Sequence, residues 1–175
     1  MAPTPVPEGV FYRFEKASVV SFVGSKLTRR HAGGFLSVAG EIVLVDGLPE
    51  RSRVRAVVDT TSVWSDTETL TSHLKSADFL EVGAYPRASF TSTAIRAEGD
   101  GVFAVTGNLD LHGVVREISF PARIEASEQE IGVTAVLEFD RSLWGIAFSG
   151  AADDLISDTV QIELELKAFP AVQEN

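Results

Sequence analysis

Apolar and polar residues alternate along most of this chain, and such alternation is typical of β-strands because successive side chains point to opposite faces. In the range 51–59, three arginines fall on one face while Val54, Ala56 and Val58 fall on the other. The same alternation recurs further along the chain. We expect clear strands at 103–111, 118–124, 131–139 and 160–167, and weaker ones at 11–16, 18–24, 34–45 and 87–95.

Turn sequences such as Asp46-Gly47 and His112-Gly113 separate these segments and give eight or nine strands. A single open sheet of this size would expose two edges and one wide apolar face. Closing the sheet on itself removes both problems. We therefore predict an all-β fold, a closed antiparallel β-barrel of about eight strands, with a two-sheet sandwich as the main alternative.

The segment 65–79 breaks the alternation. Ser65 and Glu68 have the spacing of a capping box, and Leu70 and Leu74 have helical spacing. These features predict one short helix inserted between strands in the middle of the chain. Its apolar side, together with Phe79, is expected to cover one mouth of the barrel.

Three motifs in this chain resemble those of the YceI-like family. The sequence HLKSADFLEVGAYPRASFTST at 73–93 is similar to the family signature, and VTGNLDLHGV at 105–114 is similar to its strand and turn. Arg141 with Trp144-Gly145-Ile146, followed by ISDTVQI at 156–162, resembles its closing segment. The N-terminal third departs from the family pattern, because the usual early His-Ser pair is Ala17-Ser18 here.

The resemblance covers roughly residues 11–167 and implies a lipocalin-like barrel whose lumen binds polyisoprenoids or related long-chain amphiphiles. From the residues alone, an eight-stranded barrel is either filled by its own side chains or able to hold one ligand. The resemblance favours the cavity. The expected function is binding, storage or transport of a polyisoprenoid, an isoprenoid quinone or a fatty-acid-like lipid. The alternative is a ligand-free scaffold or protein-interaction module on the same fold.

The expected ligand-binding residues are apolar and come from the inward strand faces, the helix segment and the segment 144–148. That last segment is too apolar for an ordinary exposed loop, so we interpret it as lining the ligand entrance, although its tryptophan could instead plug a barrel end. The set is Val58, Leu70, Leu74, Phe79, Phe90, Phe103, Leu109, Ile118, Phe120, Ala135, Phe139, Trp144, Ile146, Phe148, Ile162 and Leu164.

Length and charge narrow the class of protein. The 175 residues suit one domain at 11–168, with a lead-in at 1–10 and a C-terminal tail at 169–175. The net charge of −10 disfavours nucleic acid and anionic membranes as partners. The chain contains no run of about 18–20 apolar residues, so stable membrane insertion is not expected. A homodimer is compatible with these features. As the chain stands we expect a cytoplasmic protein, or a periplasmic one if a leader was removed.

Catalytic and metal chemistry are not expected. The chain has no cysteine, and its three histidines lack the spacing of metal ligands. Ser72 and His73, with Asp66 or Asp78, could suggest a hydrolase. Neighbouring residues of a helix point about 100° apart, however, and no Gly-x-Ser-x-Gly motif is present. We predict a protein that is not an enzyme and that needs no metal or cofactor.

Overall fold

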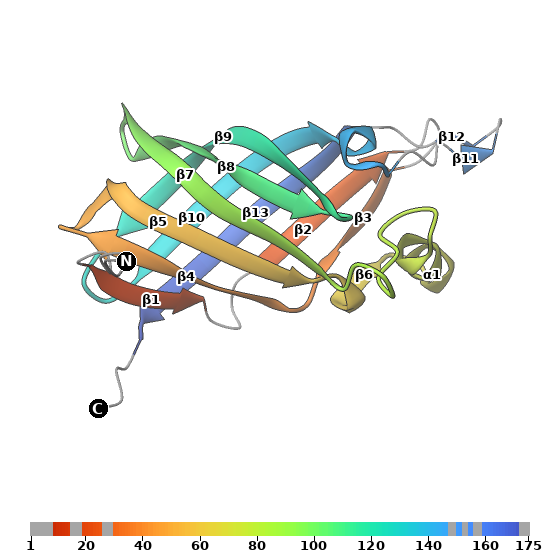
Figure 1. The fold of residues 1–175 in the computed structure, drawn as a ribbon, viewed down its shortest axis with the longest axis horizontal. Helices are drawn as coiled ribbons and strands as arrows, with labels where there is room; N and C mark the ends of the chain where they lie inside the picture. The colour runs from red at the N-terminus through yellow and green to blue at the C-terminus, as the bar shows by residue number, and fades with distance from the viewer. Residues whose placement is uncertain are drawn as a thin grey trace, which may run out of the picture.

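The computed structural model describes residues 9–14, 19–25, 30–146, 150–151, 154–155 and 159–171. It consists mainly of antiparallel strands with few helical turns (Figure 1). The strands of the main sheet are β1 (Val10–Phe14), β2 (Val19–Ser25), β3 (Arg30–Phe35), β4 (Val38–Val45), β5 (Leu48–Asp59), β6 (Val63–Ser65), β7 (Arg87–Gly99), β8 (Val102–Leu111), β9 (Val114–Ala126), β10 (Ile131–Asp140) and β13 (Thr159–Pro170). The other elements are the strand pair β11 (Gly150–Ala151) and β12 (Asp154–Leu155), the helix α1 (Glu68–Lys75), and the 3₁₀ helices η1 (Thr60–Ser62) and η2 (Arg141–Trp144).

Eight of these strands form a closed ring in the order β1-β4-β5-β7-β8-β9-β10-β13. The ring is closed by antiparallel pairing of β1 with β13, where Tyr12 lies opposite Pro170 and Phe14 opposite Ala168. The predicted closed antiparallel barrel with one α-helix is therefore confirmed, and the sandwich alternative is wrong. Closure satisfies the strand edges that an open sheet of this width would expose.

The sheet extends beyond the ring at one end. Strand β13 pairs with β1 through residues 168–170 and with β2 through residues 161–165, and the sheet then continues from β2 to β3 and β6. Figure 1 shows α1 beside β6, at the end opposite the start of β1 and the end of β13. We call the end that carries α1, η2 and the β8–β9 turn the helix end.

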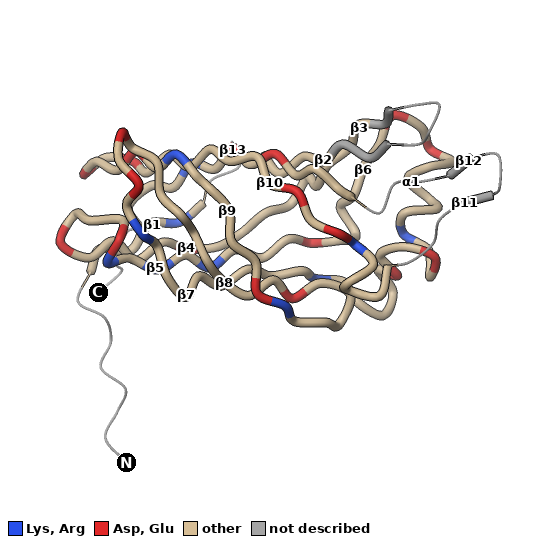
Figure 2. Tube along the Cα trace, turned by 90° about the horizontal axis from the view of Figure 1, so that it is seen from above, with Lys and Arg blue, Asp and Glu red and all other residues tan. Residues whose placement is uncertain are grey.

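The apolar residues of the alternating pattern point into the barrel, and the polar residues between them point outward. Inward residues such as Val105, Phe120 and Val133 are buried, whereas the charged residues of the same strands are exposed except for the half-buried Asp140. Figure 2 shows acidic and basic residues spread along the outer strands and turns. Away from the helix end the core is tightly packed by Tyr12, Ile42, Leu44, Ile131 and Ala168. A second apolar cluster at the helix end contains Phe79, Leu111, Trp144 and Ile146.

The helix is shorter than the sequence suggested, and its predicted cap was wrong. Helix α1 begins at Glu68, and its N-cap is Thr67, whose side chain accepts a hydrogen bond from the Leu70 N–H at 3.1 Å. Ser65 instead ends strand β6, and its hydroxyl lies 2.7 Å from that of Thr71. Thr67 already supplies the capping oxygen for the first turn, so Ser65 remains in the sheet. In the part of the chain that the structure describes, no helix is long and apolar enough to span a membrane.

One glycine shows how closely the wall is packed. Gly107 lies in the middle of β8, where the ring of Phe90 on β7 crosses over it. A Cβ at this position would lie 2.5 Å from the Phe90 ring and 2.4 Å from the Thr91 carbonyl oxygen. Glycine therefore allows the Phe90 ring to lie flat against the inner wall.

Candidate ligand-binding cavity

The barrel contains a cavity of about 260 Å³, whose wall runs from Leu74 and Ile146 at the helix end to Ile124, Val133 and Leu166 near the start of β10. Among the described residues, 26 of the 28 that line it are apolar, and the two exceptions are Ser89 and Arg141. Ring strands from β4 to β13 contribute inward side chains, β2 and β3 add Phe22 and Phe35, and the segment after α1 adds Phe79. An almost wholly apolar wall offers burial to a hydrocarbon chain and few partners to a polar ligand.

The structure places eleven of the sixteen expected ligand-binding residues on the cavity wall. They belong to strands with clear alternation, to the end of α1 and to the segments that follow α1 and η2. These residues are Val58, Leu74, Phe79, Phe90, Leu109, Ile118, Phe120, Phe139, Ile146, Ile162 and Leu164.

Three of the expected residues are placed away from the cavity by their packing. Phe103 and Ala135 point inward but belong to the packed core, where Ala135 lies opposite Ala122 and Leu164. Leu70 also lies off the wall, because α1 packs beside β6 and only its C-terminal end, with Leu74, reaches the cavity. Phe148 lies outside the described residues.

Trp144 plugs the helix end instead of lining the cavity. Its side chain is 2% exposed, and its indole N–H donates to the Leu109 carbonyl oxygen at 3.1 Å. Its ring meets that of Phe139 edge to face, with 5.1 Å between the centroids. This packing agrees with the interpretation of Trp144 as a plug, and Trp144 is not among the described residues that line the cavity. Its neighbour Ile146 does reach the cavity.

The sequence analysis missed several wall residues. Val54, Ala56 and Leu137 follow the same alternation as the residues that were chosen, so a stricter use of that pattern would have found them. Phe22 and Phe35 come from β2 and β3, where glycines weaken the alternation. No local pattern distinguishes these two rings from ordinary core residues.

Arg141 is the charged residue of the wall, and its environment stabilises the buried guanidinium group. The side chain is 4% exposed, and Nη1 donates to the Ile146 carbonyl oxygen at 2.7 Å. The guanidinium carbon lies 5.4 Å from the centroid of the Phe79 ring, a cation–π arrangement. Next to it, the Ser142 hydroxyl and backbone N–H hydrogen-bond to Asp140, and these bonds hold the pKa of Asp140 below its ordinary value.

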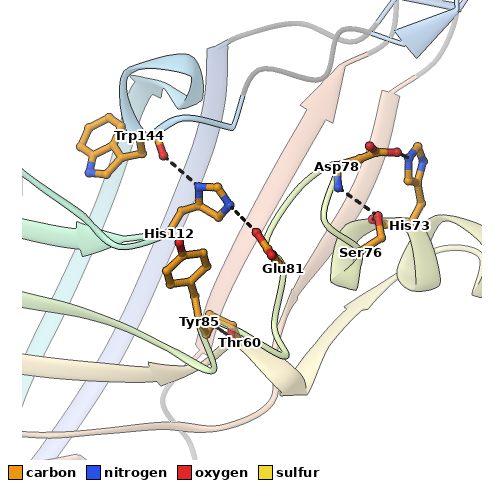
Figure 3. Close-up of polar contacts among 8 residues, drawn as sticks. All are labelled: Thr60, His73, Ser76, Asp78, Glu81, Tyr85, His112 and Trp144. Carbon is orange, nitrogen blue, oxygen red and sulfur yellow. Dashed lines mark hydrogen bonds and ion pairs between the residues drawn. The ribbon is translucent and has the colours of Figure 1, made fainter.

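Polar contacts join four segments at the helix end (Figure 3). His112 lies in the tight turn between β8 and β9, and its Nδ1 is 3.1 Å from the Trp144 carbonyl oxygen of η2. Its Nε2 lies 3.5 Å from a Glu81 carboxylate oxygen, and its ring centroid is 4.7 Å from that of Tyr85. The Thr60 hydroxyl donates to the Tyr85 carbonyl oxygen at 2.7 Å. The segment 76–85 is thus connected to the barrel from two sides.

A second histidine contacts the same segment. Nε2 of His73 lies 2.8 Å from an Asp78 carboxylate oxygen, and its ring stands edge to face on Phe79. Within the described ranges, no group of three or more histidine, aspartate or glutamate side chains could hold a metal ion. The contacts at the helix end therefore connect segments to one another around the cavity.

A family model for YceI-like domains matches residues 12–168, which is most of this chain. This chain belongs to the YceI-like domain family. The YceI-like chain is 29% identical over 162 residues to a UPF0312 protein of Pseudomonas putida (strain W619), covering 87% of this chain and 84% of that protein. It is also 31% identical over 117 residues to Protein YceI of Salmonella newport (strain SL254), covering 65% of this chain and 61% of that protein.

Two solved structures share the fold of this YceI-like chain. BcnA of Burkholderia cenocepacia matches with a TM-score of 0.79 at 21% identity, over 88% of this chain and 98% of BcnA. A polyisoprenoid-binding domain from Saccharophagus degradans matches with a TM-score of 0.76 at 21% identity, over 94% of this chain and all of that domain. These likenesses agree with the closed barrel described above.

Proposed function

We propose that this YceI-like barrel binds one long-chain apolar ligand, a polyisoprenoid or a fatty-acid-like lipid, and stores or carries it in the cavity. The observation that carries the proposal is the cavity wall, of whose 28 described residues 26 are apolar. The fold it shares with the polyisoprenoid-binding domain of Saccharophagus degradans supports the isoprenoid class. Burial of the chain then supplies the affinity, because the wall offers few polar partners.

The energetics favour long chains over short ones. Each buried CH₂ group contributes about 0.8 kcal/mol, so about ten of them contribute roughly 8 kcal/mol. Association itself costs about 4–15 kcal/mol. We therefore expect measurable affinity only for chains longer than about ten carbons. Arg141 and Ser89 are the polar residues of the wall, but the surface that the wall exposes to the cavity is almost wholly apolar, so it offers little to a head group.

The proposal includes no chemical step. The wall carries neither a carboxylate nor a histidine among its described residues, so it offers no general base to a buried lipid. His73 contacts Asp78 and Phe79 and is not among the residues that line the cavity. We propose that the ligand leaves chemically unchanged.

Lipid analysis of the purified protein tests this proposal. The protein is extracted with organic solvent, and the extract is analysed by mass spectrometry. The delipidated protein is then titrated with isoprenoid alcohols and with fatty acids of increasing chain length. We expect one ligand per chain and an affinity that rises with chain length. Failure of every long-chain lipid to bind would favour the alternative, a ligand-free interaction module on the same fold.

A further inference from the structure

The segment 76–85 forms part of the cavity wall but is folded mainly on the helix that precedes it. Phe79, which is 5% exposed, and Leu80 both line the cavity. The Leu80 N–H donates to the Leu74 carbonyl oxygen and the Glu81 N–H to that of Ser76, so backbone bonds connect the segment to the end of α1. The segment 76–85 is therefore held against the barrel mainly by its side chains, and these contacts influence how firmly the segment closes the helix end.

One of these contacts has an unusual hydrogen-bond arrangement. A carbonyl oxygen only accepts, so the bond from His112 Nδ1 to the Trp144 carbonyl requires a hydrogen on Nδ1. In a neutral imidazole the other nitrogen then carries a lone pair, and this Nε2 faces the Glu81 carboxylate at 3.5 Å. Nε2 is buried and makes no hydrogen bond. The dashed line from it to Glu81 in Figure 3 marks the 3.5 Å charge pair. The neutral ring thus turns one acceptor toward another.

Protonation of His112 turns the repulsion between Nε2 and the Glu81 carboxylate into an attraction. An imidazolium ring carries N–H groups at both nitrogens, so His112 could donate to Trp144 and to Glu81 together. The side chains of His112 and Glu81 are 15% and 40% exposed, so the pair is only partly screened by solvent. Histidine is the side chain whose charge ordinarily changes between about pH 5 and pH 8.

Among the described residues, Glu81 is the acidic residue whose carboxylate lies beside His112. On η2, the Arg141 guanidinium donates to the Ile146 carbonyl oxygen. On β9, the Arg116 guanidinium donates to the Leu143 carbonyl oxygen at 2.7 Å. From the segment itself, the Tyr85 ring packs on the imidazole. The pair of His73 and Asp78 joins α1 to the same segment, and not to the β8–β9 turn.

We propose that His112 is a pH-dependent tie that closes the cavity. In its protonated form it binds Glu81 and holds the segment 76–85 against the β8–β9 turn and η2. Loss of the proton weakens this contact, loosens the segment and speeds the release of a bound lipid. The effect on lipid release rests on the proposed function, whereas the tie between His112 and the segment does not.

Retinol is a suitable probe, because it is a fluorescent isoprenoid alcohol with no group that titrates in this range. Its release from the protein into phosphatidylcholine vesicles is followed from about pH 5.5 to about pH 8. We expect release to be about three- to tenfold slower at the acid end. His112→Gln keeps a side chain that can donate to the Trp144 carbonyl but does not titrate, and Glu81→Gln removes the carboxylate. Both variants should lose most of the pH dependence.

Glu128→Gln is the matched control, because Glu128 is an exposed glutamate in the β9–β10 turn at the opposite end of the barrel. It should keep the full pH dependence. Equal release rates at both ends of the range in the unmodified protein would overturn the proposal. A pH dependence that persists unchanged in both His112→Gln and Glu81→Gln would overturn it too. If His112→Gln fails to fold, Glu81→Gln alone decides, since its side chain is partly exposed.

Hydrogen exchange provides a reading that needs no lipid. The N–H groups of Phe79, Leu80, Glu81, Val82 and Tyr85 are hydrogen-bonded within the segment or to α1. Their protection, corrected for intrinsic exchange, should fall as pH rises in the unmodified protein and stay nearly constant in Glu81→Gln. If retinol and other lipids never bind but this protection still changes, the proposed function fails and the tie stands. Constant protection in the unmodified protein refutes the tie.

Discussion

Replacing Ala56 by phenylalanine should block the cavity without unfolding the barrel. Ala56 lies in the middle of β5, on the cavity wall, opposite Gly40 of β4 and Phe90 of β7. Its methyl group is only partly buried because it faces open space. A ring added here extends into the volume that a ligand chain would occupy.

The expected loss of affinity follows from the carbons displaced. A phenyl ring that excludes about six ligand carbons removes roughly 5 kcal/mol of burial, at about 0.8 kcal/mol for each CH₂. That loss corresponds to about a thousandfold weaker binding. The free energy of unfolding should change by less than about 1 kcal/mol, because the ring fills space that is otherwise empty.

Ala135→Phe is the comparison variant, since Ala135 lies on an inward face, is 8% exposed and is not among the residues that line the cavity. There the ring must displace packed neighbours, so we expect a loss of about 1–3 kcal/mol of stability. Thermal unfolding of delipidated protein and titration with a fluorescent isoprenoid measure both effects. The cavity assignment is wrong if Ala56→Phe destabilises the barrel as much as Ala135→Phe and leaves binding unchanged.

Three further substitutions test other parts of the structure. Leu74→Asp places a charge on the wall and should weaken lipid retention more than it changes the circular dichroism of the strands; equal retention would show that α1 does not bound the site. Gly107→Ala should lower stability by about 1–3 kcal/mol, because its Cβ would overlap a ring and a carbonyl oxygen, whereas Gly132→Ala meets nothing within 4 Å and should be near neutral in thermal unfolding. Ser142→Ala removes a donor to Asp140, so the pKa of Asp140 should rise toward its ordinary 3.8. The lowered pKa of Asp140 contributes to the free energy of unfolding at pH values above 3.8, and this contribution is lost as the pH falls through the pKa of the folded protein. The stability of Ser142→Ala should therefore depend less on pH between about 5 and 2. An acid-unfolding profile identical to that of the unmodified protein would contradict the assignment.

The sequence by itself indicated most of the strands, their two faces and a closed sheet with a sandwich as the alternative, but it predicted one strand at 34–45 where the structure has the end of β3 and β4. Period-two alternation is a local property, because each residue's neighbours along the chain fix which way its side chain points. The face containing Val54, Ala56 and Val58 was therefore readable directly and does point into the cavity. With one apolar face on every long strand, closing the sheet was the arrangement that buries all of them at once.

Only the tertiary structure decided which inward residues reach open space. Ala56 and Ala135 share the same alternation, yet one faces the cavity and the other is packed in the core, because the distance across the barrel depends on side chains from other strands. Trp144 became a plug through a bond to Leu109 on a different strand. The contact of His112 with Glu81 likewise joins distant parts of the chain. Alternation fixes the direction of a side chain within its own strand, whereas the volume left beside it depends on how all the strands pack together.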